Sequence, residues 1–252
     1  MRGKGSGAGA SAWARYRMLS GEHRHERILV RFVLAGAGGI LVAALGELWA
    51  GPATAVILFA AHAIYLRSRP GPATSWRQGA LAERRTGRRL ATLDPAAFHV
   101  LHDRVLPDAP TANLDHLVIG LTGVYTIASR RWNWGVRLWA DHRRIWAGRR
   151  SLTGLQATAA QAAKTVAEVL AAELDQVVEV FPLVAVHGAR LPRGGLERGG
   201  VILQPVRRLP RFLDGRPVIF TGAEVAAIVA AAERVLPPML GEGPYRYRAA
   251  RQ

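Results

Sequence analysis

The segment from Asn113 to Trp132 reads as two short strands joined by a glycine turn, and it carries residues that could do chemistry. Asp115 lies on the first strand, and Ala128 and Arg130 lie two residues apart on the second. Side chains two apart on a strand point to the same face, so Ala128 and Arg130 would share one face. A metal-dependent nuclease built on such a hairpin would carry a carboxylate and a lysine at these two places. The question is whether a hairpin with alanine and arginine there still supports cleavage.

The elements around this hairpin are predicted from hydrophobic periodicity, caps and turn residues. The expected order is helix 76–93, strand 98–107, the two strands of 113–132, a hairpin at 136–150, helix 154–174, strand 177–189, strand and turn 201–213, and helix 221–240. Strands interleaved with helices in this order predict an α/β domain, with a mixed β-sheet flanked by helices.

Several short segments of the sequence resemble the NERD (nuclease-related domain) family of the restriction-endonuclease-like PD-(D/E)xK superfamily. The resemblance lies in "GALAERRTGRRLATL", "HVLHDRVLP" and "NLDHLVIGLTGVYTI", and in the later helix that holds Gln161. It covers about residues 76–170 and continues plausibly to the final helix. It implies a restriction-endonuclease-like mixed sheet and a domain with a DNA-processing role, and it does not by itself establish activity.

The resemblance also implies a set of site residues. In the superfamily a helix glutamate, a strand aspartate and a strand D/E-x-K pair surround Mg²⁺, which prefers oxygen ligands and activates water. By this mapping Glu83 takes the helix position and Asp115 the first strand position, so these two would be the metal ligands. Ala128 falls where the second carboxylate belongs, Arg130 where the lysine belongs, and Gln161 matches a glutamine of the following helix.

The two replacements predict a degenerate metal site. An alanine methyl group offers no ligand, so Mg²⁺ would bind weakly if at all. Arg130 keeps the positive charge and can grip a phosphate, but it cannot act as a base at ordinary pH. The sequence therefore predicts a nucleic-acid-binding domain with weak or no nuclease activity.

An active Mg²⁺-dependent nuclease is the first alternative. Lys164 lies three residues after Gln161 on the same helical face and could supply the missing amine. No acid close to Ala128 replaces the missing carboxylate, since Asp141 lies beyond the next turn. Without the resemblance, Glu83 and Asp115 would be read as ordinary solvated or helix-capping acids.

The nearby histidines and tryptophans are weaker candidates for functional residues. His99, His102 and His116 are expected to be packing or surface residues, because His99 and His102 face opposite ways and His116 points away from Asp115. Four tryptophans alternate with arginines after the hairpin: Trp132, Trp134, Trp139 and Trp146. We expect them to form the hydrophobic face of a β-hairpin, and the alternative is a stacking surface for single-stranded nucleic acid.

The chain is strongly basic, with a formal net charge of +16 and no cysteine. Such a charge attracts polyanions, either nucleic acid or anionic lipid. Nearly all of the basic residues are arginines, which is also what a GC-rich genome would produce without any functional demand. The absence of cysteine excludes disulfides and thiolate-metal sites.

An apolar run from Phe32 to Leu66 predicts two membrane helices, at about 32–49 and 53–66, within a transmembrane hairpin of residues 28–69. Glycines 36, 38 and 39 would let the helices approach closely. Arginines on both sides of the run place the N-terminus and the C-terminal domain in the cytoplasm, so a multi-pass cell-membrane protein is expected. A cleaved signal peptide is the competing interpretation.

The predicted organisation is a disordered basic arm at 1–27, the hairpin, a linker at 70–75 and the NERD-like domain at 76–252. A membrane-surface interaction or scaffold protein that binds anionic lipid rather than DNA is the second alternative function. The position of the arginines in the fold would separate it from nucleic-acid binding.

Overall fold

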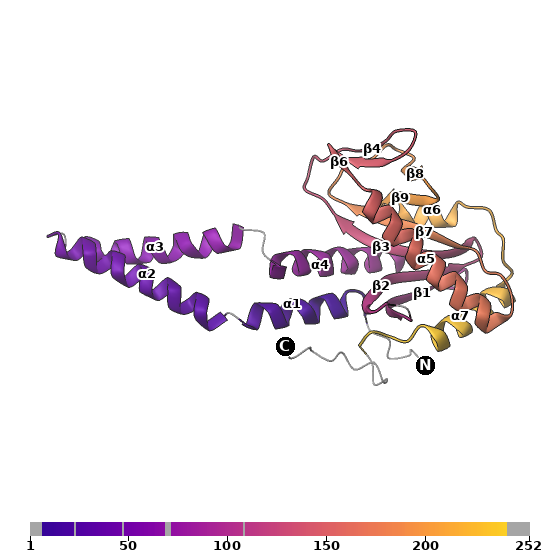
Figure 1. Ribbon diagram of the computed structural model, residues 1–252, viewed down its shortest axis with the longest axis horizontal. Coiled ribbons are helices and arrows are strands. Elements are labelled where there is room, and N and C mark those ends of the chain that lie inside the picture. Colours follow the sequence, from indigo (N-terminus) through magenta and orange to yellow (C-terminus); the bar gives the residue numbers. More distant parts are fainter. Residues whose placement is uncertain (1–6, 23, 47, 69–71, 108, 241–252) are drawn as a thin grey trace. The chain divides into compact units, whose positions relative to one another are not determined.

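The computed structural model describes residues 7–22, 24–46, 48–68, 72–107 and 109–240 (Figure 1). The chain divides into two compact units, Trp13–Arg77 and the combination of Met1–Ala12 with Gln78–Gln252. Each unit is described by itself. The predicted linker at 70–75 is not a separate segment, because its residues 72–75 lie in a helix and its first two residues lie outside the described part.

The smaller unit consists of helices. They are α1 (Ala10–Glu22, which begins in the larger unit), α2 (Arg24–Ala44), α3 (Ala50–Ser68) and the start of α4 (Pro72–Leu90). The prediction of a disordered arm at 1–27 differs from this arrangement, since residues 10–22 are helical. Alanine is the strongest helix former, and the alanines at the start of α1 favour that state.

Helices α2 and α3 pack closely at paired glycines, as the sequence predicted for Gly38 and Gly39. A Cβ atom on Gly39 would lie 2.9 Å from the carbonyl oxygen of Gly51, so only hydrogen fits there. Phe32 and Phe59 add an aromatic contact, with ring centroids 5.4 Å apart. The predicted helical hairpin is therefore present, although α2 starts earlier and ends earlier than expected.

Among the described residues, no helix is both long enough and apolar enough to span a bilayer. The predicted transmembrane hairpin and the multi-pass cell-membrane localisation are therefore wrong. The uncharged part of α2 runs only from residue 32 to residue 44, a rise of about 20 Å against the ~30 Å of a hydrocarbon core.

The larger unit is built on a six-stranded mixed sheet in the order β1-β2-β3-β7-β9-β8. Strands β1, β2 and β3 are antiparallel, β3, β7 and β9 are parallel, and β8 is antiparallel to β9. The strands are β1 Phe98–Leu106, β2 Ala109–Gly120, β3 Gly123–Arg131, β7 Val180–His187, β8 Leu196–Arg198 and β9 Val201–Pro205. A separate small sheet holds β4 Leu138–Ala140, β5 Ile145–Ala147 and β6 Arg150–Ser151. The predicted mixed sheet is confirmed.

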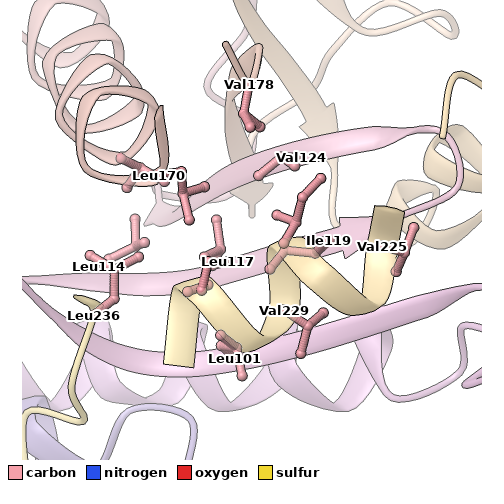
Figure 2. Close-up of a cluster of buried hydrophobic side chains, with 14 of the residues drawn as sticks. Leu101, Leu114, Leu117, Ile119, Val124, Leu170, Val178, Val225, Val229 and Leu236 are labelled. Atoms are coloured by element: carbon pink, nitrogen blue, oxygen red, sulfur yellow. The ribbon is translucent and has the colours of Figure 1, made fainter. Parts of the chain in front are cut away.

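Helices cover both faces of the large sheet. On one face α5 (Thr153–Leu174) and α7 (Gly222–Val235) pack over Leu117, Ile119 and Val124 (Figure 2). On the other face, α4 and α6 (Leu209–Asp214) pack over Val118 and Tyr125. Neighbours such as Leu117 and Val118 serve opposite cores because successive strand side chains alternate between faces. The chain order α4-β1-β2-β3-α5-β7 thus gives helix, three strands, helix and strand.

The parallel part of the sheet brings three strand ends to one edge. Arg131 at the end of β3 is in register with His187 at the end of β7, and Val186 is in register with Pro205 at the end of β9. In α/β sheets the carboxyl edge of parallel strands is where ligands commonly bind.

Helix α7 begins with a capping box that gives a first testable prediction. Thr221 Oγ1 accepts from the Glu224 amide at 3.3 Å, and the Glu224 carboxylate accepts from the Thr221 amide at 2.7 Å. Thr221→Ala leaves an amide of the first turn without its partner and should lower the free energy of unfolding by about 1 kcal/mol. Denaturant titration measures this. Glu224→Gln keeps the box and should lose less, so equal losses would contradict the capping role.

Candidate functional site

Residues from the predicted hairpin line a pocket of about 580 Å³, between β2, β3 and α5, which we call the Asp115 pocket. Asp115 contributes from β2, and Ala128 and Arg130 contribute from the same face of β3. Gln161 and Thr165 close it from α5. Most of the other lining residues are apolar: Leu106, Leu114, Leu155, Ala157, Ala159 and Ala162, with Asn113 and Thr158 as the remaining polar ones.

Arg130 lies against Asp115 in this pocket. One guanidinium nitrogen, Nη1, is 3.5 Å from Asp115 Oδ2, and the Asp115 side chain is only 8% exposed. The Ser129 amide donates to the same carboxylate oxygen at 2.7 Å, and Arg130 Nη1 also donates to the Ser129 carbonyl at 2.9 Å. A fixed cation of the chain therefore neutralises the strand carboxylate.

Glu83 lies on the inner side of α4 and is 6% exposed. Its Oε2 atom is buried without a hydrogen-bond partner in the described part of the chain. The pKa of Glu83 is raised to about 9, first by burial and then by the nearby carboxylates of Asp115 and Asp103, against the opposing effect of Arg130. A carboxyl group with such a pKa is protonated and neutral at pH 7.

The pKa of Asp115 is also raised by burial, while Arg130 and the Ser129 amide oppose the rise. Glu83 and Asp115 repel each other as anions, so the pair holds one proton more readily than none. Asp115 has a cation and an amide to stabilise its charge, and Glu83 Oε2 has neither. We therefore place the proton on Glu83 and the charge on Asp115.

A third buried acid, Asp103, was not predicted as part of the site. It is fully buried on β1 with a positive φ of 52°. Its carboxylate accepts from the Ser11 amide at 2.9 Å, the Ser11 hydroxyl at 2.5 Å and the Asn113 side chain at 2.9 Å. The available signal was the only acidic residue of a predicted strand, in the segment "HVLHDRVLP".

These acids do not fit a magnesium site. Among the described residues, no group of three His, Cys, Asp or Glu side chains is arranged to hold a metal ion. Asp115 is paired with Arg130, Asp103 is hydrogen-bonded through both oxygens, and Glu83 is protonated. Mg²⁺ needs several ionised or neutral oxygen ligands around one point, and Ala128 supplies none. We therefore derive no catalytic step through a metal.

The two predicted residues of α5 lie in different surroundings. Gln161 lines the Asp115 pocket. Lys164 is 66% exposed, lies 3.7 Å from Glu168 on the same helix and does not line the pocket. The geometry gives no support to Lys164 as a replacement for the lysine that Arg130 has supplanted.

A buried hydrogen-bonded chain joins α4 to the sheet on the face opposite the Asp115 pocket. His116 Nε2 lies 3.3 Å from the Ser129 hydroxyl, which donates to Thr86 Oγ1 at 2.8 Å, and Thr86 Oγ1 lies 2.9 Å from His187 Nε2. At its other end His116 Nδ1 lies 2.8 Å from His102 Nδ1. Thr86, Ser129 and His187 were not predicted, because they are far apart in the sequence.

These histidines are neutral inside the protein. Burial, followed by His102, lowers the pKa of His116 well below its ordinary value. The pKa of His187 is lowered to about 4, first by burial and then by the positive charges of Arg85 and Arg131. His99 is exposed on the other face of β1. The interpretation of His102 and His116 as packing residues agrees with their mutual contact and burial.

The four tryptophans separate into two pairs. Trp139 and Trp146 stack across β4 and β5 with ring centroids 5.7 Å apart and an interplanar angle of 13°, which confirms the hairpin interpretation for these two. Trp132 and Trp134 instead line a second pocket, together with arginines of α4.

Residues 78–187 match the family model of the nuclease-related domain, NERD. The match begins in α4 and ends at the last residue of β7, so it contains Glu83, Asp115, Ala128, Arg130 and Gln161. This part of the chain is therefore similar to the nuclease-related domain, as the sequence resemblance predicted. No curated protein and no solved structure matches the chain.

Proposed function

We propose that this protein binds nucleic acid through its nuclease-related domain and cleaves it weakly or not at all. The observation that carries the proposal is the placement of Arg130 3.5 Å from Asp115, beside Ala128. A guanidinium stands where a nuclease of this class would combine a metal and a lysine. It attracts phosphate oxygens, and it can neither coordinate nor deprotonate a water molecule.

The fold supports a restriction-endonuclease-like assignment. The order α4-β1-β2-β3-α5-β7 and the mixed sheet are what the superfamily resemblance implied for the chain. In this assignment Glu83, Asp115 and Arg130 occupy the former catalytic positions, and Gln161 closes the pocket. Mg²⁺ would bind weakly if at all, because the carboxylates are protonated or already paired.

The arginines also favour nucleic acid as the partner. In the described part of the chain, several of them gather on α4 and at the ends of β3 and β9, within the larger unit that carries the Asp115 pocket. Phosphate backbones are bound by such clusters with release of counterions, so affinity falls steeply with salt.

The test is a pair of assays on the full chain. Fluorescence anisotropy with labelled DNA between 50 and 200 mM NaCl should show a Kd that rises by about 10²–10³-fold. Plasmid nicking with added Mg²⁺ or Mn²⁺ should stay at the level of the buffer. Efficient cutting by the wild-type protein that Lys164→Ala abolishes would instead establish the active-nuclease alternative, and no DNA binding at low salt would leave an interaction or scaffold role.

A matched pair of variants localises the binding. Arg130→Gln should weaken DNA binding by about tenfold, because hydrogen bonds to charged groups contribute roughly 1.5–3 kcal/mol. Arg234→Gln removes the same charge from α7, where Arg234 pairs with Glu173 at 2.7 Å, and should change the Kd by less than about twofold. An equal rise in Kd for Arg130→Gln and Arg234→Gln would show that DNA binding depends only on the net charge of the protein.

A further inference from the structure

A second and larger pocket, of about 930 Å³, lies at the carboxyl ends of β3, β7 and β9 beside α4. We call it the basic pocket, and it is defined by five arginines, two tryptophans and one histidine. These are Arg85, Arg88, Arg89, Arg131, Arg207, Trp132, Trp134 and His187. It shares no lining residue with the Asp115 pocket. Arg130 and Arg131 are neighbours on β3, and strand alternation sends one to each pocket.

Among the described residues, no acidic side chain lines the basic pocket. In the part of the chain that the structure describes, none of its five arginines lies within 4.0 Å of a carboxylate. Arginines gathered around one cavity repel each other unless an anion lies between them. The positive charges of Arg85 and Arg131 also lower the pKa of His187, another lining residue, after the larger effect of burial.

The number and type of these cations indicate a ligand with several phosphates. Guanidinium groups bind phosphate oxygens through paired hydrogen bonds. Five of them exceed what a single phosphate group would need. A cavity of about 930 Å³ also exceeds the needs of one inorganic anion and lies in the range of sites for larger ligands.

The tryptophans indicate that the ligand also carries an aromatic ring. Trp134 is 86% exposed at the pocket, with the Arg190 guanidinium 5.5 Å from its ring centroid. An indole held in water next to phosphate-binding arginines is suited to stack on a nucleobase. Bases within a duplex are already stacked on their neighbours, so an unpaired base can reach Trp134 more easily than a paired one.

We propose that the basic pocket binds a short single-stranded stretch of nucleic acid, with its phosphates on the five arginines and an unpaired base on Trp134. The proposal rests on nucleic-acid binding as the function and adds a second site with a strand preference. A free nucleotide with several phosphates offers the same chemistry, and the experiment separates the two sources.

The experiment measures binding of the full chain to a labelled single-stranded 12-mer, to the same sequence as a duplex, and to either after addition of ATP. Arg88→Gln combined with Arg89→Gln should weaken single-strand binding by about 30-fold or more and lower the salt slope by about 1.4. Trp134→Ala should weaken it by about five- to a hundredfold. Duplex binding should change by much smaller factors in both variants.

Two matched control variants test whether single-stranded DNA binds at the basic pocket. Arg149→Gln combined with Arg150→Gln removes the same charge from exposed arginines outside the pocket, and Trp139→Ala removes an indole from the β4–β5 hairpin. Both should keep single-strand affinity within about threefold. If the wild type binds DNA but the pocket variants and the controls lose affinity equally, the pocket proposal fails and the proposed function stands.

The remaining outcomes are also decisive. Equal loss of duplex and single-strand binding in the pocket variants would overturn the strand preference. Displacement of the 12-mer by micromolar ATP would assign the pocket to free nucleotides and overturn the proposal of a nucleic-acid strand. Absence of any DNA binding by the wild type at low salt would refute the proposed function itself.

Discussion

Ala128→Asp combined with Arg130→Lys is expected to raise Mg²⁺-dependent nicking of plasmid DNA by about a hundredfold over the wild type. The aspartate adds an oxygen ligand on the pocket face beside Asp115, and the lysine removes the guanidinium that now pairs with Asp115. A bound metal contributes several kcal/mol to stabilising the transition state, and each ~1.4 kcal/mol is a tenfold rate change. Either single change should give less than about a tenth of this gain, because ligand and lysine act as a unit.

Measuring Mg²⁺ binding shows whether a change in nicking comes from a change in metal binding. Calorimetric titration with Mg²⁺ should show binding for the double variant and none for the wild type. Asp115→Asn in the double-variant background should abolish both the binding and the nicking. If the double variant neither binds Mg²⁺ nor cuts DNA, the assignment of Ala128 and Arg130 to the carboxylate and lysine positions is wrong.

Glu83→Gln is expected to remove a large pH dependence of stability. The pKa of Glu83 is about 9 in the folded protein against an ordinary 4.5, because of burial and then of Asp115. Between these values the folded state keeps a proton that the unfolded state releases, so the free energy of unfolding falls as pH rises. The stabilisation is fully present below pH 4.5 and is lost as pH passes through 9. Glutamine cannot titrate and has no such loss.

The difference between variant and wild type isolates this effect. Both proteins contain His116 and His187, whose lowered pKa values give the opposite slope in mildly acidic solution, and that contribution cancels. The variant should be close to the wild type in stability at pH 4.5 and more stable by a few kcal/mol near pH 9, since one pKa unit corresponds to about 1.4 kcal/mol. Urea titrations at several pH values measure this difference.

Glu179→Gln is the matched control, because the same change is made on an exposed side chain. It should alter stability by less than about 0.5 kcal/mol at every pH. A constant difference between Glu83→Gln and the wild type from pH 4.5 to pH 9 would mean that Glu83 is ionised in the folded protein. In that case Glu83 and Asp115 would both carry charge, and a metal at this site would have to be considered again.

Both variants test how the protein stabilises the buried carboxyl groups of Asp115 and Glu83. Arg130 lies against the charged Asp115, and burial keeps the carboxyl group of Glu83 neutral. A buried charge is costly unless it is paired, so each of these two carboxyl groups needs either a cation or a proton.

The sequence by itself determined the features that depend on near neighbours. The alternation along residues 113–131 predicted two strands and placed Ala128 and Arg130 on one face, which the structure confirms at the Asp115 pocket. The Thr221 cap predicted the start of α7. These signals are local, because strand alternation and helix caps involve residues only a few positions apart.

The same local signals misled where a run of apolar residues was read as a membrane anchor. The prediction placed the first helix at about 32–49, but α2 runs from Arg24 to Ala44 and takes in the charged residues of its first turns. Hydropathy does not say where a helix begins and ends, and the length of the apolar stretch within one helix decides whether it can cross a bilayer.

Only the tertiary structure decided which groups share a site. Arg130 was expected to face Asp115, but the buried Asp103 and the ionic pairing that excludes a metal depend on the register of β1, β2 and β3. The basic pocket joins α4 with the ends of β3, β7 and β9, which lie up to 120 residues apart. Parallel strands meet only through long crossovers, so their common edge cannot be read from neighbouring residues.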